Sequence, residues 1–83
     1  MSSSNLGRSN INAYTIGATA YNNGMTLELV DVLMDMDSQP CTIVFNEIIT
    51  ASNKREHTAA LKHTTGGFMF KYCGSTFYLR DFN

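Results

Sequence analysis

Residues 25–36, MTLELVDVLMDM, are the stretch from which the fold of this chain is predicted. When the segment is wound at about 100° per residue, apolar side chains form one stripe and acidic side chains lie opposite it. The stripe consists of Met25, Leu29, Val32, Leu33 and Met36, and the acidic side consists of Glu28, Asp31 and Asp35. As a strand, the same segment would mix leucines and aspartates on one face, which a half-buried sheet disfavours. The pattern therefore predicts an amphipathic helix.

The predicted helix has more apolar surface than one core contact requires. Leu27, Val30 and Met34 widen its apolar arc to about 220°, whereas a single contact needs a stripe of roughly 100°. These three residues are a candidate apolar interface for a partner or a second copy; the alternative is a helix buried under its own sheet and a folded-back terminus. The acidic side is correspondingly either a solvated face or a surface that meets a basic partner.

The segments before this helix are predicted to be a polar arm and a strand. Residues 1–12, MSSSNLGRSNIN, have few side chains to bury, so they predict a flexible N-terminal arm, and residues 13–83 form a single domain. Residues 13–21, AYTIGATAY, alternate in the manner of a strand. Residues 22–24, NNG, form the turn into the helix. A hairpin through this turn is the competing interpretation, and it would make the segment from Met25 onward a strand.

The segments after the helix are predicted to be a strand and a weak helix. Residues 37–40, DSQP, end the first helix because proline does not continue it. Residues 41–49, CTIVFNEII, are rich in β-branched side chains and favour a strand, although their apolar spacing also has helical character. Residues 51–63, ASNKREHTAALKH, predict a short surface helix or a loop, because Asn53 and Glu56 resemble a capping box above a thin apolar face.

Residues 68–82, FMFKYCGSTFYLRDF, are predicted to form a β-hairpin around a two-residue turn at 73–74. The large side chains then gather on one face in three pairs: Tyr72 with Ser75, Phe70 with Phe77, and Phe68 with Leu79. The opposite face carries Lys71, Tyr78 and Arg80, which could contact phosphates and stack on bases. These three residues are therefore the candidate nucleic-acid contact.

Composition and motifs argue against catalysis, metal binding and a membrane anchor. The formal net charge of −1 gives no overall field that would recruit nucleic acid or an anionic membrane. The absence of a long apolar run or a leader predicts a cytoplasmic protein, in which Cys41 and Cys73 are reduced thiols. His57 and His63 lie on the most polar segment and are not accompanied by a paired cysteine spacing. No catalytic residue, metal site or cofactor is predicted.

Together these segments predict an α+β domain in the order strand, helix, strand, weak helix and hairpin, with about four strands packed on one amphipathic helix. The predicted function is that of a small non-enzymatic protein-binding module, an inhibitor or adaptor that occludes a larger partner, with a homodimer expected. Viral host-takeover and anti-defence proteins that block nucleic-acid enzymes have this general appearance, so a phage accessory protein directed at a nucleic-acid-processing complex is expected by analogy. The alternative is a small nucleic-acid-binding accessory protein, because five of the six basic residues follow residue 50.

Overall fold

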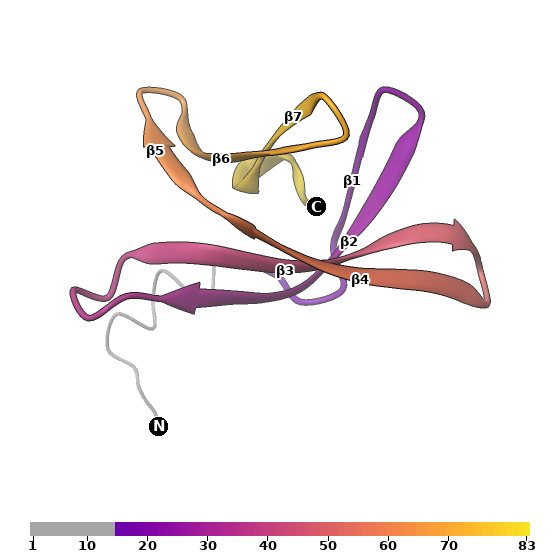
Figure 1. Cartoon of the computed structure of the whole chain (residues 1–83), viewed down its shortest axis with the longest axis horizontal. Helices are drawn as coiled ribbons and strands as arrows, with labels where there is room; N and C mark the ends of the chain where they lie inside the picture. The colour runs from indigo at the N-terminus through magenta and orange to yellow at the C-terminus, as the bar shows by residue number, and fades with distance from the viewer. Residues whose placement is uncertain (1–14) are drawn as a thin grey trace.

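The computed structural model of this chain describes residues 15–83, which form seven β-strands and one short 3-10 helix (Figure 1). Sheet A is an antiparallel sheet of four strands: β1 (Thr19–Asn22), β2 (Met25–Met34), β3 (Pro40–Thr50) and β4 (Asn53–Ala60). Sheet B is an antiparallel sheet of three strands: β5 (Lys62–Thr64), β6 (Gly67–Tyr72) and β7 (Ser75–Tyr78). The 3-10 helix η1 (Leu79–Asp81) follows β7 directly. This part of the chain has no helix with the length and apolar character needed to span a bilayer.

The predicted amphipathic helix at residues 25–36 is wrong, because most of this segment is strand β2. The physical reason is a β-bulge: Leu29 pairs with Phe45 and Asp31 pairs with Val44, which leaves Val30 as an extra residue. The bulge shifts the alternation by one position. Leu29 therefore points into the core while Asp31 points to solvent, so Leu27 and Leu29 do not share a face with Asp31, and only Leu33 lies beside it on the outer face.

The start of β2 confirms the competing hairpin interpretation of the NNG turn. Asn22 pairs with Met25 across the turn, and Asn23 and Gly24 have φ angles of 54° and 81°. Positive φ at both central residues is the geometry of the tight turn that suits the twist of a hairpin. Of the strand predicted at 13–21, only residues 19–21 lie in a strand, β1, and residues 16–17 form a turn. The predicted flexible arm at residues 1–12 lies outside the described residues.

The predicted weak helix or loop at residues 51–63 is also wrong, because this segment contains β4 and the start of β5. Its even-numbered residues from 54 to 64 lie on the outer side and its odd-numbered residues on the inner side, where Ala59 and Leu61 pack against the core. Because β4 has few large apolar side chains, its strand conformation is stabilised mainly by hydrogen bonding to β3. The fold class is therefore all-β, and the α+β prediction is corrected.

Two predictions about the remaining segments are confirmed. The strand predicted at 41–49 lies within β3. The hairpin of β6 and β7 has the predicted register, with Tyr72 opposite Ser75 and Phe70 opposite Phe77 around the turn at 73–74. The third predicted pair does not form, because Leu79 begins η1 instead of extending β7.

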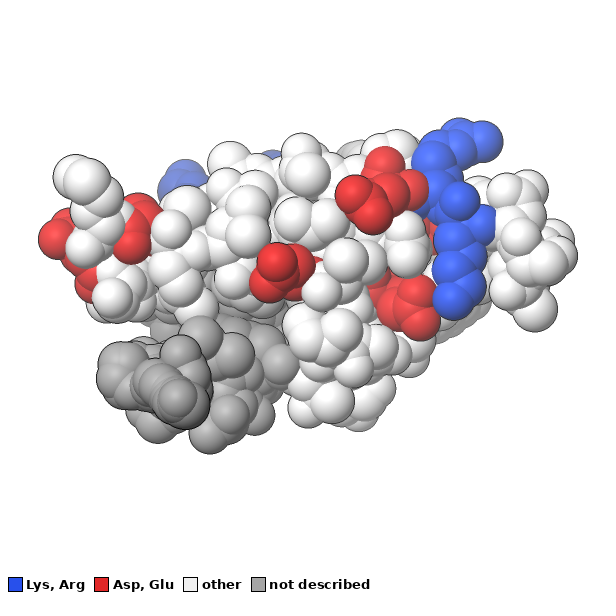
Figure 2. Space-filling model, turned by 90° about the horizontal axis from the view of Figure 1, so that it is seen from below, with Lys and Arg blue, Asp and Glu red and all other residues white. Residues whose placement is uncertain are grey.

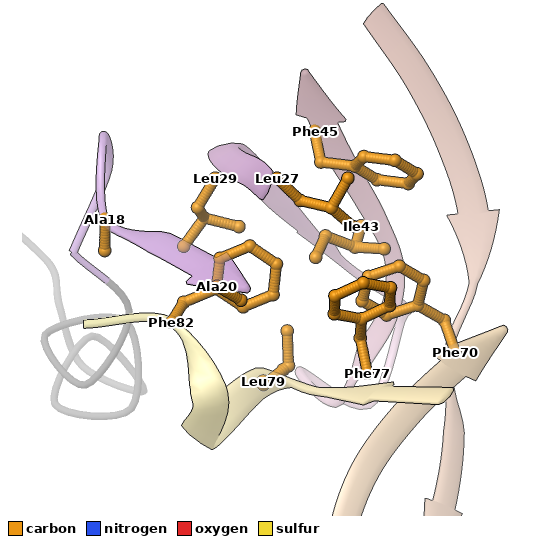
Figure 3. Close-up of a cluster of buried hydrophobic side chains, with 10 residues drawn as sticks. All are labelled: Ala18, Ala20, Leu27, Leu29, Ile43, Phe45, Phe70, Phe77, Leu79 and Phe82. Atoms are coloured by element: carbon orange, nitrogen blue, oxygen red, sulfur yellow. The ribbon is translucent and has the colours of Figure 1, made fainter. Parts of the chain in front are cut away.

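The inner faces of the two sheets enclose one hydrophobic core (Figure 3). Phe45 of sheet A is fully buried, with its ring centroid 5.2 Å from that of Phe70 and 5.1 Å from that of Tyr72. These separations are those of favourable aromatic pairs, which add to the stabilisation from burial. The buried core residues are Ala18, Ala20, Leu27, Leu29, Ile43, Phe45, Phe70, Phe77, Leu79 and Phe82.

The two sheets are joined at two corners. At one corner, the amide of Thr19 donates to the carbonyl of Asn83 at 3.2 Å and the amide of Asn83 donates back to Thr19 at 3.0 Å. At the other corner, β4 runs into β5 through Leu61, whose amide donates to the Cys41 carbonyl at 2.9 Å (Figure 1). As a result, each sheet has one face in the core and one outer face, and the functional side chains of interest lie on these outer faces.

Candidate binding surfaces

The outer face of sheet A carries carboxylates on β2 and β4, the two strands that flank β3. Glu28 and Asp31 lie on β2, and Glu56 of β4 joins them because Glu28 and Glu56 are both paired with Asn46 of β3. We call Glu28, Asp31 and Glu56 the acidic face. Viewed from this side, the molecule shows separate carboxylates on a surface that is otherwise largely uncharged, with a band of basic side chains toward one end (Figure 2). The predicted acidic helix is thus replaced by an acidic sheet face.

Glu28 is partly neutralised within the molecule. Its Oε1 accepts hydrogen bonds from Asn46 Nδ2 at 3.3 Å and from Lys54 Nζ at 3.2 Å. These two hydrogen bonds, in that order, lower the pKa of the Glu28 carboxyl below its ordinary value, and the positive charge of Lys54 adds to the effect. Glu28 is therefore ionised in the folded protein, and much of its charge is balanced by a neighbour rather than available to a partner.

Asp35, the third predicted member of the acidic surface, has a structural role in the turn between β2 and β3. Its Oδ1 accepts hydrogen bonds from the amide of Asp37 at 2.8 Å and the amide of Gln39 at 3.0 Å. The same turn places Ser38 at a φ of 61°, a conformation that needs such support. Asp35 is therefore separated from the acidic face and holds the turn that precedes Pro40.

The candidate apolar interface does not survive as one surface. Leu27 is fully buried in the core, so it offers no area to a partner. Val30 at the bulge and Met34 at the end of β2 are half-buried. The large apolar side chains that are exposed are different ones, namely Ile16, Tyr21, Leu33, Met36 and Ile49. Leu33, 44% exposed, lies on the outer face of sheet A beside Thr42, and half-buried Val44 lies next to Asp31.

The outer face of sheet B brings together the three residues predicted to contact nucleic acid. Strand pairing aligns Lys71 with Thr76 and Met69 with Tyr78 on this face, as the predicted hairpin register requires. The guanidinium carbon of Arg80 lies 4.4 Å from the centroid of the Tyr78 ring, which is a cation–π contact. Lys62 also lies on this face, where it pairs with Met69, and it was not predicted as a contact residue. Its signal was hidden because residues 51–63 were not predicted to be strands.

The two outer faces differ in charge. Sheet A with its turns holds six of the seven carboxylates and two basic residues, whereas sheet B with η1 holds three basic residues and one carboxylate. The three basic residues are Lys62, Lys71 and Arg80, and we call them the basic face. The single carboxylate is Asp81, which accepts a hydrogen bond from the Tyr78 amide at 2.9 Å. The charge asymmetry of the sequence is therefore also an asymmetry in space.

A polar cluster that the sequence did not reveal lies between the sheets. The Tyr72 hydroxyl donates to Glu47 Oε1 at 2.6 Å, and His57 Nε2 lies 3.0 Å from the same hydroxyl. The hydroxyl has one proton, and it donates that proton in the hydrogen bond to Glu47. The His57 nitrogen is therefore assigned as the donor to the Tyr72 oxygen. The hydrogen bond to Glu47, followed by burial and by the charge of Glu47, raises the pKa of the Tyr72 hydroxyl above its ordinary value.

We expect the variant Tyr72→Phe to lower the free energy of unfolding at neutral pH by about 1.5–3 kcal/mol, the usual contribution of a hydrogen bond to a charged group. In the unmodified protein, stability should also fall as the pH rises above about 10, because unfolded tyrosine then ionises while folded Tyr72 keeps its proton. The variant should lose less stability in this range. Urea unfolding from about pH 7 to pH 11 measures both effects.

The control for this experiment is Tyr21→Phe, since Tyr21 is 74% exposed and should change neutral-pH stability by less than about 0.5 kcal/mol. Parallel stability curves for Tyr72→Phe and the unmodified protein above about pH 10 would contradict the proposed origin of the pKa shift.

The other residues considered for chemistry do not form a site in the described part of the chain. Cys41 and Cys73 are free thiols, and His63 stacks on Phe68 with ring centroids 4.6 Å apart. Among residues 15–83, no three histidine, cysteine, aspartate or glutamate side chains are grouped so that they could hold a metal ion. In comparisons with known proteins, no family model, no characterised protein and no solved structure matches this chain.

Proposed function

We propose that this chain is a small non-enzymatic binding module that acts as an inhibitor or adaptor by occluding a larger protein partner, and that the outer face of sheet A is its contact surface. The observation that carries the proposal is the composition of that face. Apolar side chains remain accessible there between carboxylates, and sheet B covers only the opposite face. Accessible apolar area with a charged margin is the usual composition of a protein interface.

Two features of the face support a protein rather than a nucleic acid as its partner. Exposed Leu33 and half-buried Val44 provide apolar area, which contributes affinity when a partner removes it from water. Asp31 and Glu56 provide negative charge that repels phosphates and speeds association with a basic surface. Neither carboxylate forms an ion pair within residues 15–83, so both charges are available to a partner.

We extend the proposal to the cytoplasm and to partners that process nucleic acid. The free thiols Cys41 and Cys73 agree with a reducing compartment. Proteins that act on nucleic acid expose basic surfaces, which an acidic face would occupy. Occlusion of such a surface is how a viral host-takeover or anti-defence protein would act.

The test is capture from a lysate by the immobilised chain, followed by an affinity measurement with the protein that is retained. The double variant Asp31→Lys with Glu56→Lys should weaken that affinity by about tenfold or more, because like charges would then face each other. Asp37→Lys is the matched control: it makes one of the same charge changes in the β2–β3 turn, away from the acidic face, and should change affinity less than about twofold.

Equal affinity of the double variant and the unmodified chain would remove the acidic face from the proposal. A second copy as the partner is a separate outcome, and light scattering distinguishes it. If the chain self-associates and the double variant is a monomer, the partner of this face is another copy of the chain rather than a larger protein.

A further inference from the structure

The outer face of sheet B contains basic side chains without acidic partners. Lys62 and Lys71 are exposed, and neither forms an ion pair or a side-chain hydrogen bond within residues 15–83. They lie on adjacent strands, since Lys62 pairs with Met69 and Lys71 is two residues further along the same strand. The two lysines therefore give the same face two positive charges without a carboxylate partner, and an anionic ligand would balance them.

Next to the lysines, Arg80 and Tyr78 form a fixed platform. Arg80 lies over the Tyr78 ring and its Nη1 donates to the carbonyl of Gly66. The turn that supplies this carbonyl is itself held by Thr64, whose Oγ1 accepts from the Gly66 amide at 3.1 Å and donates to the Gly67 carbonyl at 2.8 Å. The guanidinium is therefore oriented before any ligand arrives, which reduces the entropy cost of binding.

Gly66 packs closely against this platform. A Cβ atom added at Gly66 would lie 3.3 Å from Tyr78 Cε2, which is tighter than most carbon contacts, and 3.5 Å from Arg80 Nη1, which is an ordinary contact. The backbone of the β5–β6 turn thus packs against the platform, and a side chain at position 66 would displace the Tyr78 ring by a few tenths of an ångström.

The lysines also border a pocket at the bend where β4 becomes β5. Its volume is about 400 Å³, within the range of ligand-binding pockets, and it is lined by Ala60, Lys62, Thr64, Met69, Phe70 and Lys71. Both free lysines line this pocket, and its other side chains are apolar apart from one threonine. The pocket therefore combines apolar walls with positive charge at its margin.

We infer that the basic face binds single-stranded nucleic acid, with the lysines and Arg80 contacting phosphates and the pocket accepting an unstacked base. A base is a flat, largely apolar group attached to an anionic backbone, which matches this surface. A guanidinium plane such as that of Arg80 is also a known stacking surface for unpaired bases. A duplex fits less well, because its bases are already stacked and no helix projects from this sheet to enter a groove. The inference concerns sheet B and does not depend on protein docking at sheet A.

The number of basic residues sets the strength of binding and its salt dependence. With three phosphate contacts, the logarithm of the association constant should fall against the logarithm of salt with a slope of about −2. Affinity should then decrease about 20-fold between roughly 50 and 200 mM salt. A slope of this size identifies contact through the basic face, because the formal net charge of the whole chain is −1 and would by itself oppose binding.

The experiment is fluorescence anisotropy of labelled oligothymidine and oligouridine, each of about 20 nucleotides, titrated with the full chain at several salt concentrations. The double variant Lys62→Gln with Lys71→Gln should bind about tenfold or more weakly at low salt, with a slope reduced to about −0.7. The matched control is Lys54→Gln with Arg55→Gln, which removes the same charge from sheet A and should change affinity less than about twofold. Gly66→Ala should weaken binding without changing the charge, and circular dichroism checks that every variant is folded.

Three results would overturn the inference. The first is no anisotropy change at low salt with either oligonucleotide. The second is an equal loss of affinity in the sheet A control and the sheet B variant, which would indicate attraction without a defined surface. The third is displacement of the oligonucleotide by polyglutamate as effectively as by unlabelled strand, which would assign the surface to acidic peptides instead.

Discussion

Replacing Phe45 by alanine is expected to lower the free energy of unfolding by about 3–5 kcal/mol, the usual cost of truncating a fully buried phenylalanine. Phe45 is 0% exposed, and its ring contacts those of Phe70 and Tyr72 from sheet B and stacks on His57 from β4. The variant would therefore lose contacts in both sheets. A chain of 83 residues has a total stability of about 4–12 kcal/mol, so a large fraction of the variant would be unfolded at the lower end of that range.

Equilibrium unfolding in urea, followed by tyrosine fluorescence and circular dichroism, measures this loss. The control is Val44→Ala, because Val44 directly precedes Phe45 on β3 but its half-buried side chain lies on the outer face. Its truncation should cost about 1 kcal/mol or less. Similar losses in the two variants would contradict the assignment of inner and outer faces in β3, and with it the position of the core.

The strand β2 shows why the fold class was not predictable from the pattern of apolar residues alone. Both a helix and a bulged strand separate the apolar from the acidic residues of this segment, and the bulge at Val30 depends on pairing with β3, the next strand, which the pattern within residues 25–36 does not contain. A strand without a bulge would place Asp31 on the same face as Leu29, and for this reason the sequence pattern argued against a strand. Two further register shifts in sheet A, next to Met34 and Thr50, have the same effect on local periodicity.

The prediction for the segment of β4 was wrong for a different reason. Its residues 53–58, NKREHT, contain no large aliphatic side chain, so neither propensity nor periodicity indicates a strand. Backbone hydrogen bonds to β3 decide its conformation, and a single-sequence pattern does not contain that information. In contrast, the β6–β7 hairpin was predictable in its register, because a Cys-Gly turn and aromatic residues on one face specify it locally.

The candidate-site residues were likewise predictable only where a local hairpin positions them. Lys71, Tyr78 and Arg80 were placed on one face correctly because their positions depend on that local hairpin. Lys62 was missed because its strand, β5, begins in the segment 51–63 that was not predicted to be a strand, although it forms a short hairpin with β6. The cluster of Glu47, Tyr72 and His57 was missed because it requires strands that are far apart in the sequence to meet.

Replacing Phe82 by alanine is expected to open the corner where the end of the chain pairs with β1. Phe82 is 7% exposed and packs in the core, with its ring centroid 6.3 Å from that of Phe70. Its burial holds the adjacent Asn83 in position for the two backbone hydrogen bonds with Thr19. The variant should therefore lose about 3 kcal/mol of stability. The conservative variant Phe82→Leu should lose less than about 1.5 kcal/mol, because it keeps most of the buried volume.

Native-state hydrogen exchange separates this local opening from a general loss of stability. In Phe82→Ala, the Thr19 amide should exchange at the rate of an open strand edge, because its acceptor on Asn83 is released. The Leu61 amide, which donates to Cys41 at the other corner, should lose protection only in proportion to the global stability. Equal loss of protection at the two amides would show that Phe82 stabilises the whole core without closing this corner. A larger loss at Thr19 would establish that the two sheets are joined there by the packing of a single aromatic side chain.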